Sequence, residues 1–282
     1  MQQIIKDFPG VRALDGVSLA LEKGEFHALV GENGAGKSTL MKVLSGAYPA
    51  GSFQGEILIE NTPVRFSSVA DSEAAGIAII FQELSLVKDM TVAENIFLGQ
   101  EPSRFGLIRW HELYSRTSAL LRELGLEIDP QTPVGELGIG RQQLVEIAKA
   151  LSKNARILVL DEPTAALTES EVEILFQILE RLRRRGVGMI YISHKLEEVF
   201  RMADRITVLR DGRSVTSRPA KDFNRSKVIE YMVGRQVEDI FPDRIRQPGR
   251  VVFRASGINA YFPGSKRKAV DNVSFEVREG EV

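Results

Sequence analysis

Residues 31–38 have the composition and spacing of a loop that binds nucleotide phosphates. They follow an apolar run and precede a helix expected to begin near Lys37, so backbone N–H groups and the positive helix end would face the same anion. Lys37 would neutralise the β and γ phosphates, and the Ser38 hydroxyl would bind Mg²⁺. A glycine-rich surface turn is the alternative, which the flanking elements disfavour. The predicted ATP- or GTP-binding residues are Gly31, Glu32, Asn33, Gly34, Ala35, Gly36, Lys37, Ser38 and Thr39.

Two adjacent carboxylates end a second apolar run, residues 157–160. Beside a triphosphate, Asp161 could hold Mg²⁺ through its water shell, and Glu162 could polarise the water that attacks the γ phosphate. A strand end of this kind taken alone is as often a solvated turn. The phosphate loop elsewhere in the chain favours the catalytic interpretation.

The elements that position these residues alternate along the chain. Five short apolar runs predict buried strands, and stretches with helical spacing lie between them, which indicates an α/β fold. The segment from about residue 84 to 140 reads as mostly helical, so we expect a helical subdomain inserted into a domain with a mixed sheet. The expected strands are Phe26–Val30, Ile77–Phe81, Ile157–Leu160, Met189–Ile192 and Ile206–Leu209, and the expected helices are Leu113–Leu124, Gln142–Leu151, Glu169–Arg185 and Leu196–Met202.

Bulk composition is that of an ordinary globular protein. The 282 residues are 43% hydrophobic and 27% charged, and the formal net charge of -1 gives no indication of a nucleic-acid partner. The chain has no cysteine, which excludes disulfides and thiolate metal sites. No apolar run has the length of a signal peptide or of a membrane span, so we expect any membrane link to come through a partner.

A linker and a repeat divide the chain. Residues 241–253 have linker composition, so we expect a first domain over 1–240. Beyond the linker, residues 254–282 repeat the beginning of that domain and stop before any phosphate loop, which predicts the start of a second copy. The repeat pairs Leu14-Asp15-Gly16-Val17-Ser18-Leu19 and Gly24-Glu25 with Val270-Asp271-Asn272-Val273-Ser274-Phe275 and Gly280-Glu281.

These motifs, taken in order, resemble the ABC-type ATPases, a class of P-loop NTPases. The resemblance implies that Gln82 senses Mg²⁺ and the attacking water and links to the permease, that His194 contacts the γ phosphate, and that Phe8 stacks on adenine. It also implies ATP and Mg²⁺ as cofactors. His27 and His111 match no motif and are interpreted as structural. The stretch that resembles the signature loop, which binds ATP held by an opposite domain, is Gly138, Ile139, Gly140, Arg141 and Gln142.

This loop departs from the family pattern. Serine usually stands where Gly138 stands, and glutamine where Arg141 stands. Gly138 keeps the backbone amide but lacks the hydroxyl that would bind the γ phosphate. We therefore expect a weakened contribution from this loop.

Within the family, the chain most resembles tandem-domain ATPases of monosaccharide importers, and residues 48–56 with the glycine-containing signature most resemble the D-xylose importers. The resemblance implies permease subunits, a periplasmic or extracellular sugar-binding protein, and a second nucleotide-binding domain or a homodimer. It places the chain peripherally on the cytoplasmic face of the plasma membrane. A soluble tandem ATPase without a permease is the alternative, disfavoured by the short linker. A module that binds nucleotide without turnover is disfavoured by Lys37, Asp161, Glu162 and His194.

Overall fold

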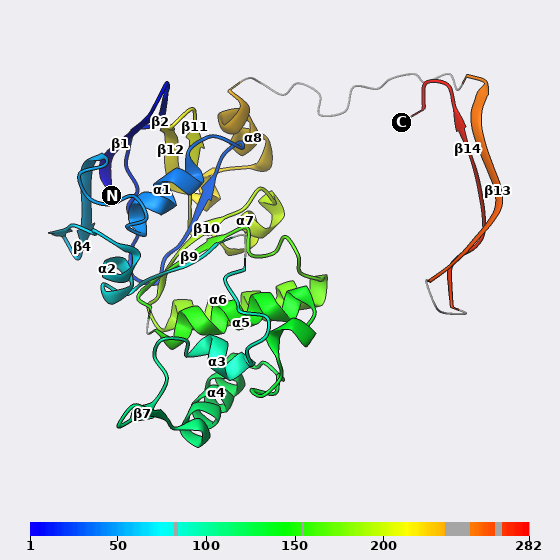
Figure 1. Cartoon of the computed structure of the whole chain (residues 1–282). Coiled ribbons are helices and arrows are strands. Elements are labelled where there is room, and N and C mark those ends of the chain that lie inside the picture. The colour runs from blue at the N-terminus through cyan, green and yellow to red at the C-terminus, as the bar shows by residue number, and fades with distance from the viewer. Residues whose placement is uncertain (82–83, 154, 235–248, 263–266, 282) are drawn as a thin grey trace. The chain divides into compact units, whose positions relative to one another are not determined.

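The structure is a computed structural model that describes residues 1–81, 84–153, 155–234, 249–262 and 267–281. The chain divides into two compact units, Met1–Gln236 and Val237–Val282 (Figure 1). Most of the predicted linker lies outside the described residues. Each unit is considered by itself.

A six-stranded sheet forms the centre of the first unit. Its order is β12-β11-β3-β10-β9-β6, in which β12 (Arg213–Pro219) runs antiparallel to β11 and the other strands are parallel. The five predicted strands are confirmed, with small changes at their ends, and so is the α/β class with a mixed sheet. They are β3 (Phe26–Val30), β6 (Ile77–Ile80), β9 (Ile157–Asp161), β10 (Gly188–Ile192) and β11 (Arg205–Arg210).

A second, antiparallel sheet is built from two strands that precede the phosphate loop in sequence and two that follow it. Its order is β2-β1-β4-β5, and its strands mix buried, half-buried and exposed residues instead of forming continuous apolar runs. The search for apolar runs therefore missed these strands. They are β1 (Gln2–Phe8), β2 (Val11–Val17), β4 (Gln54–Ile59) and β5 (Thr62–Val64), followed by α2 (Val69–Ala74).

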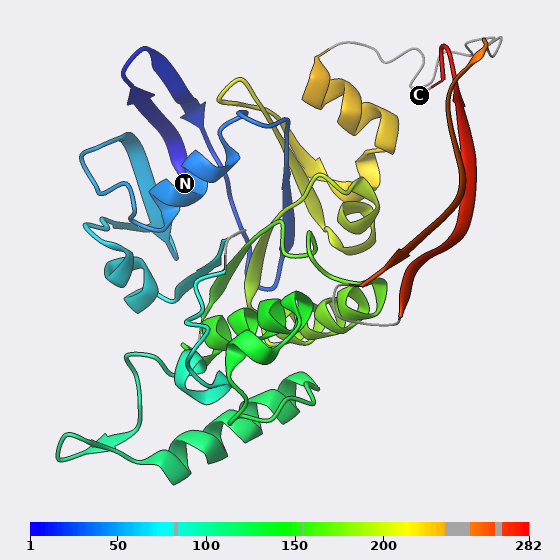
Figure 2. The ribbon, with the colours of Figure 1, turned by 45° about the vertical axis from the view of Figure 1, so that its right-hand side comes forward.

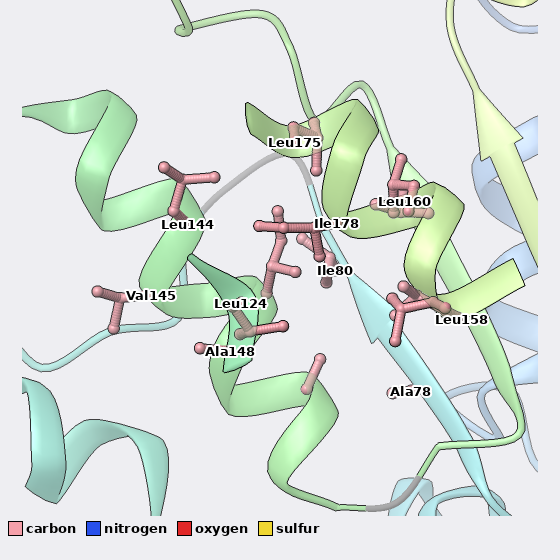
Figure 3. Close-up of a cluster of buried hydrophobic side chains, with 14 of the residues drawn as sticks. Ala78, Ile80, Leu124, Leu144, Val145, Ala148, Leu158, Leu160, Leu175 and Ile178 are labelled. Atoms are coloured by element: carbon pink, nitrogen blue, oxygen red, sulfur yellow. The ribbon is translucent and has the colours of Figure 1, made fainter. Parts of the chain in front are cut away.

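Both faces of the central sheet are covered, which explains why its strands are apolar throughout. In β9, Leu158 and Leu160 enter a cluster with helices α5 (Ile139–Ser152) and α6 (Glu169–Arg184), where Figure 3 shows side chains from β6, β9, α5 and α6 gathered. Val159 points to the opposite face, into a cluster with Leu40 of α1 (Lys37–Leu44). A third cluster packs α7 (Leu196–Met202) and α8 (Arg225–Val233) on β3 and β11.

The segment predicted to be mostly helical lies at one end of the sheet, away from β1 and β4 (Figures 1 and 2). It contains α3 (Val92–Ile96), α4 (Trp110–Leu124), a 3₁₀ turn (Val134–Glu136) and the start of α5. It also contains a short hairpin of β7 (Ser103–Arg104) and β8 (Leu107–Ile108), which the sequence analysis did not anticipate. Within the described residues, no helix is long and apolar enough to cross a membrane.

The second unit is a long antiparallel hairpin, β13 (Val251–Tyr261) with β14 (Lys268–Arg278). Its local geometry matches the start of the first unit. Gly16 and Asn272, equivalent in the sequence repeat, both have positive φ, 69° and 50°. In both copies a backbone N–H donates to the carboxylate three residues later at 2.6 Å, from Glu22 to Glu25 and from Arg278 to Glu281.

His27 is fully buried in β3, whereas His111 is exposed at the start of α4. The His27 ring nitrogens lie 2.9 Å from the carbonyl oxygen of Ala20 and 2.7 Å from the hydroxyl of Thr207. Burial lowers the pKa of His27 below its ordinary 6.5, against the opposing effect of Glu25. The neutral imidazole is therefore part of the folded structure, as the structural interpretation expects.

We predict that His27→Gln destabilises the chain mainly above pH 6.5. The pKa of His27 is lower in the folded chain than in the unfolded chain. The neutral ring therefore contributes its full stabilisation at pH 7.5, and this contribution is lost as the pH falls below 6.5. In urea unfolding, the free energy of unfolding of the variant should be about 1–3 kcal/mol below that of the wild type at pH 7.5, and the difference should be smaller at pH 5.5. The exposed His111→Gln variant is the control. An equal deficit at both pH values would contradict the prediction.

Candidate active site

The phosphate loop connects β3 to α1, at the edge where the parallel strands end. Gly34 and Gly36 have φ of 83° and 104°, which favours glycine. At Gly31 the constraint is space, because a Cβ there would lie 2.3 Å from the carbonyl oxygen of Leu209 in β11. Helix α1 then begins at Lys37 with no side-chain cap and no acidic residue in its first turn. Its N-terminal end is suited to an anionic ligand.

Lys37 bends back over the loop that precedes it. Its Nζ donates to the carbonyl oxygens of Gly31 at 2.7 Å and Glu32 at 3.0 Å. Burial lowers the pKa of Lys37, while the charges of Asp161 and Glu162 oppose that effect. The ammonium is thus held by weak acceptors that phosphate oxygens can replace.

Asp161 ends β9 opposite the phosphate loop. Burial raises its pKa, and the neighbouring charge of Glu162 raises it further, whereas Lys37 and a hydrogen bond from the Ser38 hydroxyl lower it. A partly buried carboxylate paired with a hydroxyl offers hard oxygen ligands, the kind Mg²⁺ prefers together with phosphate oxygens and water. Ser38 and Asp161 therefore fit the predicted Mg²⁺ site.

Glu162 and His194 form a pair beside Asp161. The His194 Nδ1 lies 3.0 Å from the Glu162 Oε1, and the imidazole is largely exposed. Glu162 adopts φ of 50°, which is uncommon outside glycine, and its N–H donates to the carbonyl oxygen of Ile192 at 2.9 Å. The ends of β9 and β10 are thereby joined where they carry the two side chains. Such a pair can orient and polarise a water molecule.

Lys37, Ser38, Asp161 and Glu162 line one cleft of about 440 Å³, whereas His194 is not on its wall and contacts Glu162. Two further segments of the wall, in β2 and in the turn after β11, contain residues that were not predicted from the sequence. The Asp211-Gly212 dipeptide could have been found, because it directly follows a predicted strand of the same sheet. The predicted residues on the wall are Asn33, Gly34, Gly36, Lys37, Ser38, Thr39, Asp161 and Glu162, and the others are Val11, Arg12, Ala13, Asp211 and Gly212.

The remaining predicted residues lie elsewhere. Gly31, Glu32 and Ala35 belong to the loop but do not line the cleft. Phe8 packs against Tyr48, with ring centroids 5.5 Å apart, and the Lys6 ammonium lies 5.1 Å from the Phe8 ring centroid. Its stacking on adenine stays a prediction. Gln82 lies outside the described residues.

The predicted signature loop starts α5 and contributes nothing to the wall of this cleft. Gly138 is the N-cap residue and supplies no side-chain hydrogen bond, and Ile139 is 61% exposed. Gly140 packs against the Glu171 carboxylate, which lies 2.2 Å from where a Cβ would stand. The Gln142 amide donates to the carbonyl oxygen of Leu137 at 2.8 Å, and Arg141 is exposed.

Family comparison agrees with this geometry. Residues 14–165 match the family model described as ABC transporter. A xylose import ATP-binding protein of Thermoanaerobacter pseudethanolicus is 56% identical over 285 residues, covering all of this chain and 56% of the relative. An L-arabinose transport ATP-binding protein of Geobacillus stearothermophilus is 47% identical with the same coverage. The chain spans little more than half the length of these relatives.

Solved structures give the same fold. An ATP-binding cassette of an ABC transporter, MJ1267 in its ADP conformation, has a TM-score of 0.70 at 29% identity, covering 83% of this chain and 97% of that one. The cassette MJ0796, a dimer in a post-hydrolysis state bound to ADP and Pi, has a TM-score of 0.65 at 26% identity, covering 79% and 98%. The fold is that of an ABC-type ATP-binding cassette. This chain belongs to the ABC transporter family.

We predict that Asp161→Asn stabilises the nucleotide-free chain. The folded pKa of Asp161 is raised above the unfolded one, so its negative charge costs stability once the pH is above the folded pKa. At neutral pH, thermal unfolding should show Tm higher by about 1–3 °C, with a smaller further rise on adding Mg-ATP than in the wild type. Asp211→Asn, an exposed change at the same cleft, is the control. A lower Tm for the nucleotide-free Asp161→Asn variant would contradict this account.

Proposed function

We propose that this chain binds Mg-ATP and hydrolyses it to energise import of a monosaccharide through a separate membrane permease. The observation that carries the proposal is that Lys37, Asp161 and Glu162 line the cleft at the end of the parallel strands, where His194 contacts Glu162. An ammonium, a carboxylate suited to a metal ion and a carboxylate–imidazole pair are the groups that phosphoryl transfer to water requires.

The proposed roles follow the positions of the side chains. The loop amides and the start of α1 bind the phosphates, and Lys37 exchanges its two carbonyl acceptors for phosphate oxygens. Ser38 and Asp161 would hold Mg²⁺, which would neutralise negative charge on the phosphates. Glu162 accepts a proton from the attacking water, and His194 orients Glu162 and reaches the γ phosphate. Gln82 and Phe8 keep their predicted roles in this proposal, toward Mg²⁺ and adenine.

A second nucleotide-binding domain completes the site in this proposal. The chain's signature residues, Gly138–Gln142, do not line its own cleft, and they would instead close on ATP held by another domain. Dimerisation of the related cassette MJ0796 with bound ADP and Pi supports this arrangement. The matching geometry of Gly16 and Asn272 supports the interpretation of residues 1–240 as one domain and 254–282 as the start of another.

The substrate class rests on the relatives. Proteins named for xylose import and L-arabinose transport match the whole chain, which supports a pentose and, by the higher identity, D-xylose. The proposed partners are permease subunits and, through them, a periplasmic or extracellular sugar-binding protein, with the chain peripheral to the cytoplasmic face of the membrane. The soluble alternative receives no support from these relatives.

We predict that ATP hydrolysis by the purified chain rises faster than linearly with protein concentration, because each signature loop serves the site of another copy. Glu162→Gln should bind Mg-ATP with unchanged affinity and lose at least about 100-fold in turnover, since general-base catalysis contributes on that scale. Phosphate release and equilibrium nucleotide binding measure the two effects. Brisk turnover independent of protein concentration would refute the dependence on pairing, and turnover retained in the variant would refute the role of Glu162.

A further inference from the structure

A buried hydrogen-bond cluster lies behind the Glu162–His194 pair and is centred on Glu198 of α7. Three hydroxyls contact the same carboxylate oxygen, Oε2: Tyr191 at 2.7 Å, Thr164 at 2.8 Å and Ser193 at 3.4 Å. The Glu198 side chain is only 12% exposed. The Lys195 Nζ lies 3.4 Å from the other oxygen, Oε1.

The hydroxyls come from the two segments that carry the catalytic pair. Thr164 lies two residues after Glu162, in the turn that follows β9. Ser193 directly precedes His194, in the turn that follows β10. Lys195 adds a second link, because its ammonium donates to the carbonyl oxygen of Thr164 at 3.1 Å. One carboxylate on a third element thus joins both turns.

The chemistry of the cluster suits a carboxylate acceptor. A carboxylate can accept several hydrogen bonds at once, and bonds to a charged acceptor are stronger than neutral ones. Tyr191 is fully buried, and both burial and its bond to Glu198 raise its pKa, so its hydroxyl stays a donor. Leaving such a buried group without partners is costly, which makes the cluster resistant to rearrangement.

We propose that Glu198 is a positioning residue that holds the turns carrying Glu162 and His194 at the separation at which the two side chains meet. The inference rests on the proposed function, because it gives that pair a role in ATP hydrolysis. Glu198 does not line the cleft and touches no part of the proposed nucleotide site. Its removal therefore affects turnover through geometry and leaves nucleotide binding intact.

The chain offers a matched control in the preceding residue. Glu197 lies on the same helix, but its side chain is 80% exposed and pairs with Arg225 at 2.8 Å. Substituting it removes an equal charge from α7 without touching either turn. Thr164→Val gives a milder test, because it removes one hydroxyl contact to Glu198 and leaves the carboxylate in place.

The experiment compares Glu198→Ala, Thr164→Val and Glu197→Ala with the wild type. Amide hydrogen exchange without nucleotide reports on residues 161–167 and 192–196. Because misplacement of about 1 Å can cost about 100-fold in rate, we expect kcat for Glu198→Ala to fall about 10- to 100-fold. The dissociation constant for Mg-ATP should stay within about twofold, since the cleft wall is unchanged. Thr164→Val should give a smaller loss and Glu197→Ala none.

A double-mutant cycle of Glu198→Ala and His194→Ala distinguishes loss of positioning from a general loss of local structure. If Glu198 acts through the pair, Glu198→Ala should cause no further loss of kcat in the His194→Ala background. Faster exchange in both turns supports the proposal. The proposal is overturned if amide exchange in Glu198→Ala is the same as in Glu197→Ala. It is also overturned if Glu198→Ala lowers kcat equally in the wild-type and His194→Ala backgrounds. Absence of Glu162-dependent turnover in the wild type would instead remove the proposed function, while exchange in the two turns still decides whether Glu198 holds them.

Discussion

The hydrogen-bond ladder among β3, β10 and β9 is the constraint on which the rest of the site depends. Its parallel register pairs Leu29 with Ile192 and Ile192 with Asp161, so all three strands end at one level. The phosphate loop, the carboxylates and His194 follow directly from those ends. One further bond, from the Glu162 N–H to Ile192, carries the register past the last strand residue. A slip of one residue would turn every side chain to the opposite face of the sheet.

This edge of the sheet gathers charges that the folded chain does not fully satisfy. Asp161 and Glu162 repel each other, and Lys37 relieves the repulsion only partly while it donates to loop carbonyls. Burial is unfavourable for both the ammonium and the carboxylate. A bound anion with a divalent cation would supply the missing partner for each sign at once. A ligand that carries both charges would relieve these unfavourable interactions, and this relief would contribute to its binding affinity.

The sequence predicted the parts of the fold that have simple periodicity. Continuous apolar runs identified the five buried strands, and the phosphate loop was evident from glycine spacing and flanking elements. The antiparallel strands β1, β2, β4 and β5 escaped because their half-buried residues give no such run. The approach of Arg12 and Asp211 to the cleft depends on tertiary contacts, as does the convergence of Tyr191, Thr164 and Ser193 on Glu198. A glutamate in an amphipathic helix gives no signal of that kind.

The start of α5 has the same physical character as the start of α1, and this likeness bears on how two domains would cooperate. Both helices begin after a glycine N-cap with no side-chain bond and no acid in the first turn. Near α5, however, the Glu171 carboxylate accepts hydrogen bonds from Thr168 and packs on Gly140. The negative charge beside this helix start would oppose an approaching phosphate, and Gly138 lacks the hydroxyl that could compensate. If α5 meets the phosphate of a second domain, as proposed, that phosphate would have to be neutralised already by Mg²⁺ and a lysine, as it would be in an occupied phosphate loop. This requirement would make closure of two domains depend on bound nucleotide.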